Sequence, residues 1–283
     1  IFAAKGRPAN HPLIVHVADA SGVDHFAANV PDFARRLIDA FWPGPLTLIL
    51  PRRPGVGAAA AGGQDSIGLR CPSHPVAQAV LRACAAQGVF GLAAPSANPF
   101  GRVSPTTAAH VQAGMGDALL VIDGGACDVG IESTIVDCTR GAPVLLRPGG
   151  ISRAQVEAAC GQPLRDGAAL DAPDPKASGT LLAHYAPAAP VRLMDAKALQ
   201  TALDLLGADA AHIATWSRAI LKTPSSGVIR RRMPEDAAAT AQQLFAVLRE
   251  FDAQGARLIW IETPPETPEW EAVRDRLQRA AAA

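Results

Sequence analysis

The sequence predicts an α/β protein of 283 residues with two domains. Apolar runs rich in β-branched residues alternate with helical patterns up to residue 160, and a second alternation begins at Val191. The stretch 161–187 between them is rich in Pro, Gly, Asp and Ala and is longer than most loops within a domain. We therefore predict a first domain at 1–160, a linker at 161–187 and a smaller α/β domain at 188–283.

The first domain is predicted to contain a mixed sheet, because several of its strands are joined by links too short for a crossover helix. A pair of residues, Ser152 and Gln155, predicts a capping box at one helix, and Gly6 predicts the end of another. The predicted strands are Leu13–Val17, Leu46–Leu50, Ser66–Arg70, Val89–Ala94, Leu119–Ile122, Ser133–Asp137 and Val144–Arg147. The predicted helices are Pro31–Phe41, Pro75–Gln87, Pro105–Ala113 and Arg153–Cys160.

The second domain repeats the alternation of strands and helices over fewer residues. Its predicted strands are Val191–Met194, His212–Thr215 and Arg257–Glu262. Its predicted helices are Lys197–Leu206, Pro234–Asp252 and Pro268–Ala281.

Composition narrows the class of protein. Lys and Arg together number 26, as do Asp and Glu, so the chain has no net charge and does not resemble a dedicated nucleic-acid coat. No apolar run approaches the roughly 20 residues of a membrane helix, so no membrane partner is predicted. The 5 cysteines are widely spaced and form no C-x-x-C pair, which predicts thiols in a reducing cytoplasm and no metal site or disulfide framework.

Cationic side chains stand beside turns at the ends of predicted strands. Lys5 and Arg7 flank Gly6 shortly before an apolar run that contains His16. Arg70 ends another predicted strand. An arginine there could bind a carboxylate or phosphate with two hydrogen bonds, or could equally pair with an Asp or Glu on the surface. Arg147 ends a third strand before a Pro-Gly-Gly turn. His16 taken alone is better explained as a core histidine.

The stretch "GLAAPSANPFGRVSPT" adds neutral polar groups at a strand end. Ser96 and Asn98 suit ligand binding, although a plain turn would use the same residues. Ser104 before Pro105 predicts either an anion site at a helix N-terminus or an ordinary N-cap. Several such strand ends together predict one shared cleft for an anionic ligand, without a P-loop or a G-x-G-x-x-G turn.

A set of motifs in this order resembles one family. "KGRPANHPLIVHV", "WPGPLTLIL", "IGLRCPSHP", "APSANPFGRVSPT", "ESTIVD", "LLRPGGIS" and "HYAP" are similar to segments of bacterial threonylcarbamoyl-AMP synthases of the two-domain type. The resemblance is dense from residue 1 to residue 187 and looser beyond it. It implies a YrdC-type twisted mixed sheet around a concave cleft, followed by a smaller Rossmann-like domain.

The resemblance also implies roles for residues of this chain. Lys5 and Arg7 would be catalytic and face the ATP phosphates. The L-threonine pocket would comprise His16, Arg70, Ala94 and Ser133. The nucleotide side would comprise Arg7, His11, Ser66, Ser96, Asn98, Ser104, Arg147 and Tyr185. His11 stands where the family usually has asparagine, and Ser178 where it often has proline in a linker that would close over the substrates.

The implied reaction joins L-threonine, bicarbonate and ATP into threonylcarbamoyl-AMP and pyrophosphate, with Mg²⁺ expected on the ATP. The product would feed tRNA threonylcarbamoyladenosine modification in the cytoplasm. The tRNA-modifying machinery is therefore the expected macromolecular partner, and direct binding of tRNA stays open. Two alternatives stay open. One is a non-catalytic binder of double-stranded RNA or tRNA, and the other is a carbamoyltransferase of the same fold.

The start of the chain raises one further expectation. Family members carry a strand and a Thr-rich turn before the segment at which this sequence opens. We therefore expect the chain to be an N-terminally incomplete version of the enzyme, with poor solubility and little synthase activity, because an absent strand would leave backbone groups uncovered.

Overall fold

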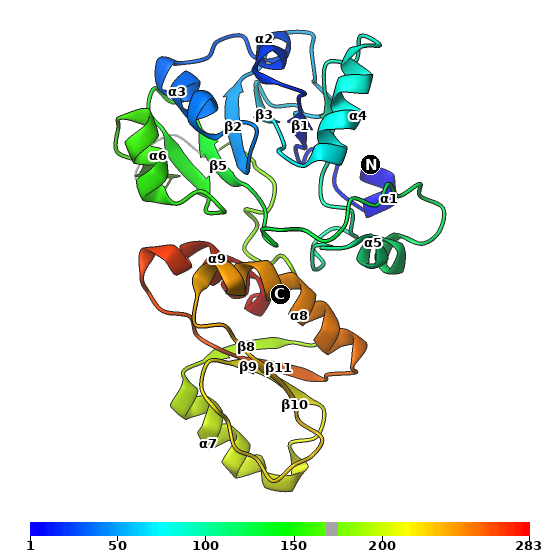
Figure 1. Cartoon of the computed structure of the whole chain (residues 1–283), viewed down its shortest axis with the longest axis vertical. Helices are drawn as coiled ribbons and strands as arrows, with labels where there is room; N and C mark the ends of the chain where they lie inside the picture. The colour runs from blue at the N-terminus through cyan, green and yellow to red at the C-terminus, as the bar shows by residue number, and fades with distance from the viewer. Residues whose placement is uncertain (168–174) are drawn as a thin grey trace. The chain divides into compact units, whose positions relative to one another are not determined.

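The computed structural model describes residues 1–167 and 175–283, which form two compact units (Figure 1). The first unit comprises Ile1–Ser96 and Glu132–Thr180, and the second comprises Ala97–Ile131 and Leu181–Ala283. Each unit has its own sheet and its own core. None of the helices in the described part of the chain is both long and apolar enough to cross a membrane.

The first unit is built on a seven-stranded mixed sheet with the order β4-β1-β3-β2-β5-β6-β7. Pairs β1–β3, β2–β5 and β6–β7 are parallel, and the other neighbouring pairs are antiparallel. The strands are β1 (Ile14–His16), β2 (Leu46–Pro51), β3 (Ser66–Arg70), β4 (Leu92–Ala93), β5 (Thr134–Asp137), β6 (Val144–Arg147) and β7 (Arg165–Asp166).

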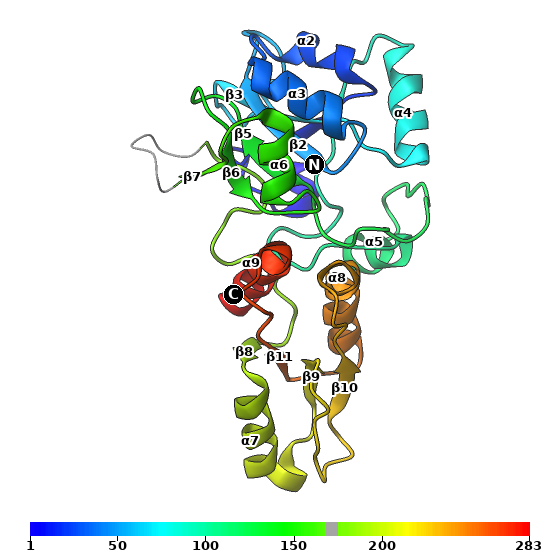
Figure 2. The same cartoon turned by 60° about the vertical axis from the view of Figure 1, so that its left-hand side comes forward.

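Helices cover one face of this sheet (Figure 2). The main core lies there, where Phe33 and Leu37 of α3 and Val156 of α6 pack against Leu48 of β2 and Leu69 of β3. The helices of the unit are α1 (Phe2–Lys5), α2 (Val23–Phe26), α3 (Asp32–Phe41), α4 (Pro75–Ala85) and α6 (Arg153–Cys160).

The opposite face of the sheet carries two of the polar residues that the sequence singled out. Successive side chains of a strand point to opposite faces. Since Leu46, Leu48 and Leu50 of β2 belong to the helix-covered core, Thr47 and Ile49 lie on the other face. The same alternation places His16 and Arg70 on that face, which we call the open face.

The second unit contains a four-stranded parallel sheet with the order β10-β9-β11-β8. Its main core packs α8 and α9 against one face, and a smaller cluster packs α7 against the other (Figure 2). The strands are β8 (Val191–Met194), β9 (Ile213–Ser217), β10 (Ile229–Arg232) and β11 (Leu258–Glu262). The helices are α5 (Ala108–Met115), α7 (Ala196–Leu206), α8 (Ala237–Ala253) and α9 (Glu271–Ala281).

Most predicted elements are confirmed, several of them with the predicted bounds. The capping box at Ser152 and the helix end at Gly6 are confirmed as well. The strand predicted at Leu119–Ile122 is wrong: the segment pairs with no described strand, and Leu120 is 92% exposed. An apolar run with no partner strand stays a loop.

Other predicted bounds also differ: the strand predicted at Val89–Ala94 is confirmed only over β4 (Leu92–Ala93). Three further differences stand out. The helix predicted from Pro105 begins at Ala108, with Thr107 rather than Ser104 as its N-cap, because the Thr107 hydroxyl accepts from the His110 amide. Strand β10 was not predicted, because its three arginines interrupt the apolar pattern. The predicted linker contains β7 beside β6, and its residues 168–174 lie outside the described part of the chain.

Candidate active site

Lys5 is held at the end of α1, where Gly6 adopts the left-handed conformation (φ 62°) and turns the chain. Lys5 is buried, and its Nζ donates to the Ser96 carbonyl at 2.6 Å. Burial, with the nearby charge of Arg7, lowers the pKa of Lys5 to about 8. The site therefore keeps an ammonium that is poorly solvated and remains mostly charged at neutral pH.

Arg7 is fixed by main-chain carbonyls of the following turn. Its Nη2 donates to the Pro12 carbonyl at 2.6 Å and lies 2.8 Å from His11 Nδ1. Burial, together with the charge of Arg7, lowers the pKa of His11 to about 4, so the imidazole is neutral and Nδ1 can accept. Burial also lowers the pKa of Arg7, to about 10, which leaves the guanidinium charged.

His16 and Arg70 are brought together by strand register. They are partners at the carboxyl ends of the parallel strands β1 and β3. Arg70 Nε donates to the Gly44 carbonyl at 3.0 Å, which anchors its guanidinium. Burial and the charge of Arg70 lower the pKa of His16 to about 4. Beside a neutral imidazole, the arginine supplies the positive charge of this part of the open face.

A buried hydroxyl pair lies next to the third strand-end arginine. Thr47 Oγ1 and Ser133 Oγ are 2.7 Å apart, and Arg147 Nη2 donates to the Ser133 carbonyl at 2.8 Å. Arg147 Nη1 donates to the Ser178 carbonyl at 2.8 Å. All four groups are held in fixed positions, as precise binding of a polar substrate requires.

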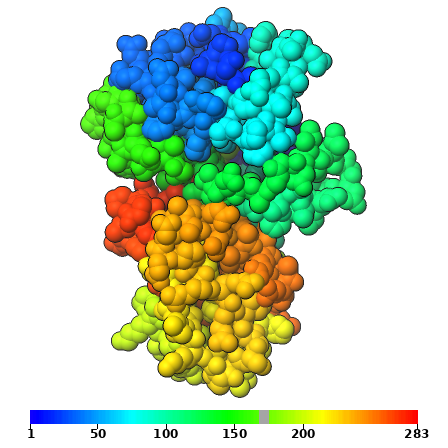
Figure 3. All heavy atoms as spheres, in the orientation of Figure 1, coloured from blue at the N-terminus to red at the C-terminus, as the bar shows by residue number. Residues whose placement is uncertain are grey.

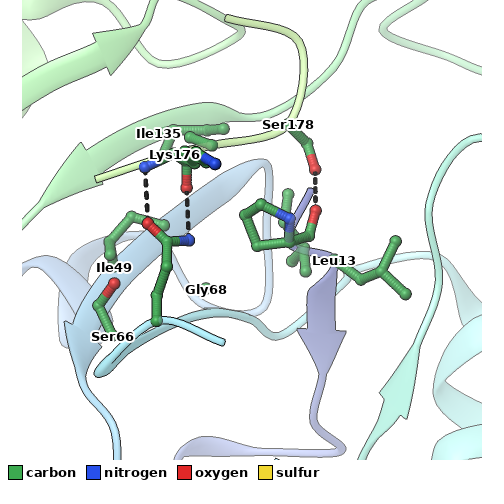
Figure 4. Close-up of a pocket in the computed structure, with 11 residues that line it drawn as sticks. Leu13, Ile49, Ser66, Gly68, Ile135, Lys176 and Ser178 are labelled. Atoms are coloured by element: carbon green, nitrogen blue, oxygen red, sulfur yellow. Dashed lines mark hydrogen bonds between the residues drawn. The ribbon is translucent and has the colours of Figure 1, made fainter. Parts of the chain in front are cut away.

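The segment 176–178 of the predicted linker lies on the open face (Figure 4). Gln64 accepts from the Lys176 amide at 2.7 Å and donates to its carbonyl at 3.1 Å. Ala177 is buried against Ile49 and Ile135. Ser178 Oγ accepts from Arg7 Nη2 at 3.1 Å and donates to the Pro12 carbonyl. The remaining cavity is only about 10 Å³, room for one water molecule.

The other predicted site residues divide between the two units. Ser66 lines the small cavity under residues 176–178, and the Ala94 amide donates to the Ile14 carbonyl beside β1. Ser96 also belongs to the first unit, as the acceptor for Lys5. The first unit thus holds ten of the predicted residues: Lys5, Arg7, His11, His16, Ser66, Arg70, Ala94, Ser96, Ser133 and Arg147.

Asn98, Ser104 and Tyr185 belong to the second unit, where each is buried. Asn98 Nδ2 donates to the Arg102 carbonyl at 2.8 Å, and the Ser104 carbonyl accepts from Arg249 at 3.1 Å. Tyr185 is in the left-handed conformation (φ 62°), with its ring centroid 5.2 Å from that of Phe245. The roles of these three residues toward a nucleotide stay predictions.

Sequence reasoning missed Thr47, Gln64 and Ser178 as parts of this site. Thr47 had a signal, since it is the one polar residue of "LTLIL" and is fully buried. Gln64 and Ser178 follow no pattern that marks their contacts. Among the described residues, no three His, Cys, Asp or Glu side chains gather as metal ligands.

The fold and this site define a class: a two-domain α/β protein whose first unit holds buried cations beside a buried hydroxyl pair. A family model described as telomere recombination (Sua5, YciO and YrdC) matches residues 1–149. A second model, described as the C-terminal domain of threonylcarbamoyl-AMP synthase, matches residues 151–282.

Named relatives cover nearly the whole chain. The threonylcarbamoyl-AMP synthase of Bacillus subtilis is 35% identical over 291 residues, 99% of this chain and 82% of the relative. That of Pyrococcus abyssi is 33% identical over 292 residues, 99% of this chain and 83% of the relative. The crystal structure of P. abyssi Sua5 complexed with L-threonine matches with a TM-score of 0.85 and 33% identity, over 99% of this chain and 83% of that one. The chain belongs to the two-domain threonylcarbamoyl-AMP synthase family.

Proposed function

We propose that the protein makes threonylcarbamoyl-AMP and pyrophosphate from L-threonine, bicarbonate and ATP, for the modification of tRNA. The strongest support is that relatives named for this activity cover 99% of the chain. The buried cations of the open face supply the chemistry that such a reaction needs, because the transferred phosphoryl group is highly charged.

On the nucleotide side, Lys5, Arg7 and Arg147 bind the phosphates of ATP. The support for this assignment is geometric. Arg7 and Arg147 both contact Ser178, so one triphosphate bound next to that serine can reach both guanidinium groups. A guanidinium has five N–H donors and can serve the linker and a phosphate together. In this proposal His11, Ser66 and Ser96 complete the nucleotide side within the first unit.

On the threonine side, Arg70 binds the carboxylate as a bidentate pair beside neutral His16. Ser133 and the main chain at Ala94 complete the pocket. The proximity of Ser133 to Arg147, 3.2 Å between Oγ and Nη2, brings the threonine side next to the phosphate side. The two substrates therefore meet on one face of one sheet.

In the proposed reaction, the threonine amine adds to bicarbonate with loss of water and gives a carbamate. A carbamate oxygen attacks the α-phosphorus, and the bond to the leaving pyrophosphate breaks. Lys5 and Arg7 stabilise the charge that builds on the phosphate oxygens. Mg²⁺ enters with ATP as part of the substrate, because phosphate oxygens are ligands it favours and the chain's own groups at this face are cationic.

A pyrophosphate-release assay on the complete gene product tests this function. We expect release that requires both L-threonine and bicarbonate. Pyrophosphate release that ignores either substrate would contradict the proposed reaction. Salt-sensitive RNA binding without nucleotide turnover would instead support the RNA-binding alternative.

ATP affinity should depend on pH through Lys5. Its pKa of about 8 means that the ammonium is charged below pH 8 and is lost as the pH rises above that value. The dissociation constant of ATP should therefore rise above pH 8, by up to about tenfold per pH unit, when measured by titration calorimetry between pH 6.5 and 9.5. Lys5→Arg, whose charge persists, should flatten this rise, whereas an identical rise in both proteins would exclude Lys5 as the titrating group.

The segment 176–178 is proposed to act as a lid over bound substrates. Trypsin should cleave after Lys176 in the free protein and several times more slowly with ATP and L-threonine, because phosphates and Ser178 share the arginines. Gln64→Ala removes both hydrogen bonds to Lys176 and should speed cleavage of the free protein. Equal cleavage rates with and without substrates would contradict the lid and indicate that the segment is only a spacer.

A further inference from the structure

A pocket lies on the second unit, at the carboxyl ends of the parallel strands β9 and β10. It measures about 220 Å³ and is open to solvent. The loop 218–228 that joins the two strands is part of the surface, drawn in yellow in Figure 3. This crossover contains no helix, and α7 packs on β11. The exposed residues of this part of the sheet are those of β10, whereas β9 is buried throughout.

The pocket lies at a switch point in the topology of the sheet. Leu221 of the loop after β9 packs into the cluster on the α7 face, whereas β10 leads into α8 on the opposite face. Adjacent strands whose connections leave toward opposite faces open a crevice at their carboxyl ends, and parallel α/β sheets bind ligands there.

The lining of the pocket is rich in donors and contains no acid. Strand register places Arg230 and Arg232 beside Thr215 and Ser217, while Arg231 aligns with Trp216 on the other face. Arg231 also lines the pocket, but its guanidinium pairs with Glu250 of α8. The Arg230 side chain has no hydrogen bond or ion pair with any described residue. The Arg232 side chain has only an exposed pair with Glu235, which contributes little.

Other donors face the same space. Thr215 is buried and lines the pocket, and its hydroxyl has no hydrogen-bond partner in the described part of the chain. The backbone amides of Ile220 and Leu221 likewise donate to no described residue. Ile220, 84% exposed, adds an apolar wall.

Glu262 at the end of β11 fixes the start of the pocket loop. Its Oε2 accepts from Ser217 Oγ at 2.7 Å, from the Arg218 amide at 2.7 Å and from the Ala219 amide at 3.1 Å. The Glu262 carboxylate is therefore fully hydrogen-bonded within the loop and does not face the pocket as a negative charge. A loop held in this way presents its next amides in a defined position.

We infer that this pocket binds a small phosphate monoester that carries an apolar or planar group. The guanidinium of Arg230, the Thr215 hydroxyl and two backbone amides match the three terminal oxygens of a phosphate. The apolar wall at Ile220 and Leu221 accommodates the rest of the ligand. The site is separate from the proposed synthase site and does not depend on it.

Hydrogen exchange of the complete gene product, with AMP as the probe, tests the inference. AMP should slow exchange in residues 218–232, and adenosine at the same concentration should not. Arg230→Gln should weaken this response to AMP by about 10-fold to 150-fold, the loss expected for one charge-assisted hydrogen bond. Thr215→Val should weaken it as well, with only the hydroxyl removed.

Arg192→Gln is the matched control, because it removes the same charge from an exposed arginine of β8 in the same unit, which does not line the pocket. It should change the response to AMP less than about twofold. An equal response to adenosine, or no response in 218–232, would overturn the proposal. An equal loss in Arg230→Gln and Arg192→Gln would also overturn it, because that result would identify a diffuse polyanion surface such as one for RNA.

Discussion

Replacing Lys5 with methionine is expected to lower the rate of pyrophosphate release by about 100- to 1000-fold at saturating substrates, the usual loss when one preorganised charge is removed from a transition state. Lys5 is only 7% exposed and is held by the Ser96 carbonyl, so its ammonium cannot swing away from the phosphates at low cost. The protein already bears the cost of burying this charge beside Arg7, which is why the pKa of Lys5 is lowered. A charge kept in so unfavourable a place stabilises an anion more strongly than one in water.

Methionine is suited to this test because it fills nearly the same volume without the charge. The rate should be measured by pyrophosphate release, and the fold should be verified by circular dichroism. Lys197→Met, at an exposed position of α7, removes one lysine outside the site and should leave the rate unchanged. If Lys5→Met keeps its rate within about threefold of the parent, Lys5 does not act on the transition state.

The local part of the fold was predictable from the sequence. Strands Ser66–Arg70 and Val144–Arg147 have the predicted bounds, because apolar side chains fill them and each ends in an arginine with a proline one or two positions further on. The alternation of side chains along β1 and β3 also places His16 and Arg70 on one face once the strands are known. Local pattern and strand ends thus predicted much of the candidate site.

Contacts between distant segments were not predictable in the same way. Ser178 contacts Arg7, 171 positions away, and Arg147, 31 positions away, and no local pattern encodes either pairing. The strand order β4-β1-β3-β2-β5-β6-β7 likewise depends on pairings between segments far apart in sequence. The segment 97–131 groups with the C-terminal residues through contacts such as that of Arg249 with the Ser104 carbonyl, which the order of motifs does not reveal.

Arg70→Ala should raise the KM for L-threonine by about 30- to 1000-fold, the equivalent of about 2–4 kcal/mol for a charged bidentate contact in a desolvated site. ATP affinity should change little, because Lys5, Arg7 and Arg147 supply the proposed phosphate contacts. Arg70→Lys keeps the charge but loses the planar guanidinium, so its KM for L-threonine should lie between that of the parent and that of Arg70→Ala. Arg53→Ala, an exposed arginine of the same unit, is the control and should behave like the parent.

A second readout separates a role in binding from a general loss of structure. Burial and the charge of Arg70 together lower the pKa of His16 to about 4. In Arg70→Ala only burial remains, so the pKa of His16 should rise toward its ordinary value, and NMR titration of the imidazole measures that change directly. If the pKa of His16 rises in Arg70→Ala but the KM for L-threonine does not change, Arg70 affects the charge of His16 but does not bind the threonine carboxylate. A variant in which both the pKa and the KM for threonine rise places the carboxylate beside His16, where the ends of β1 and β3 meet.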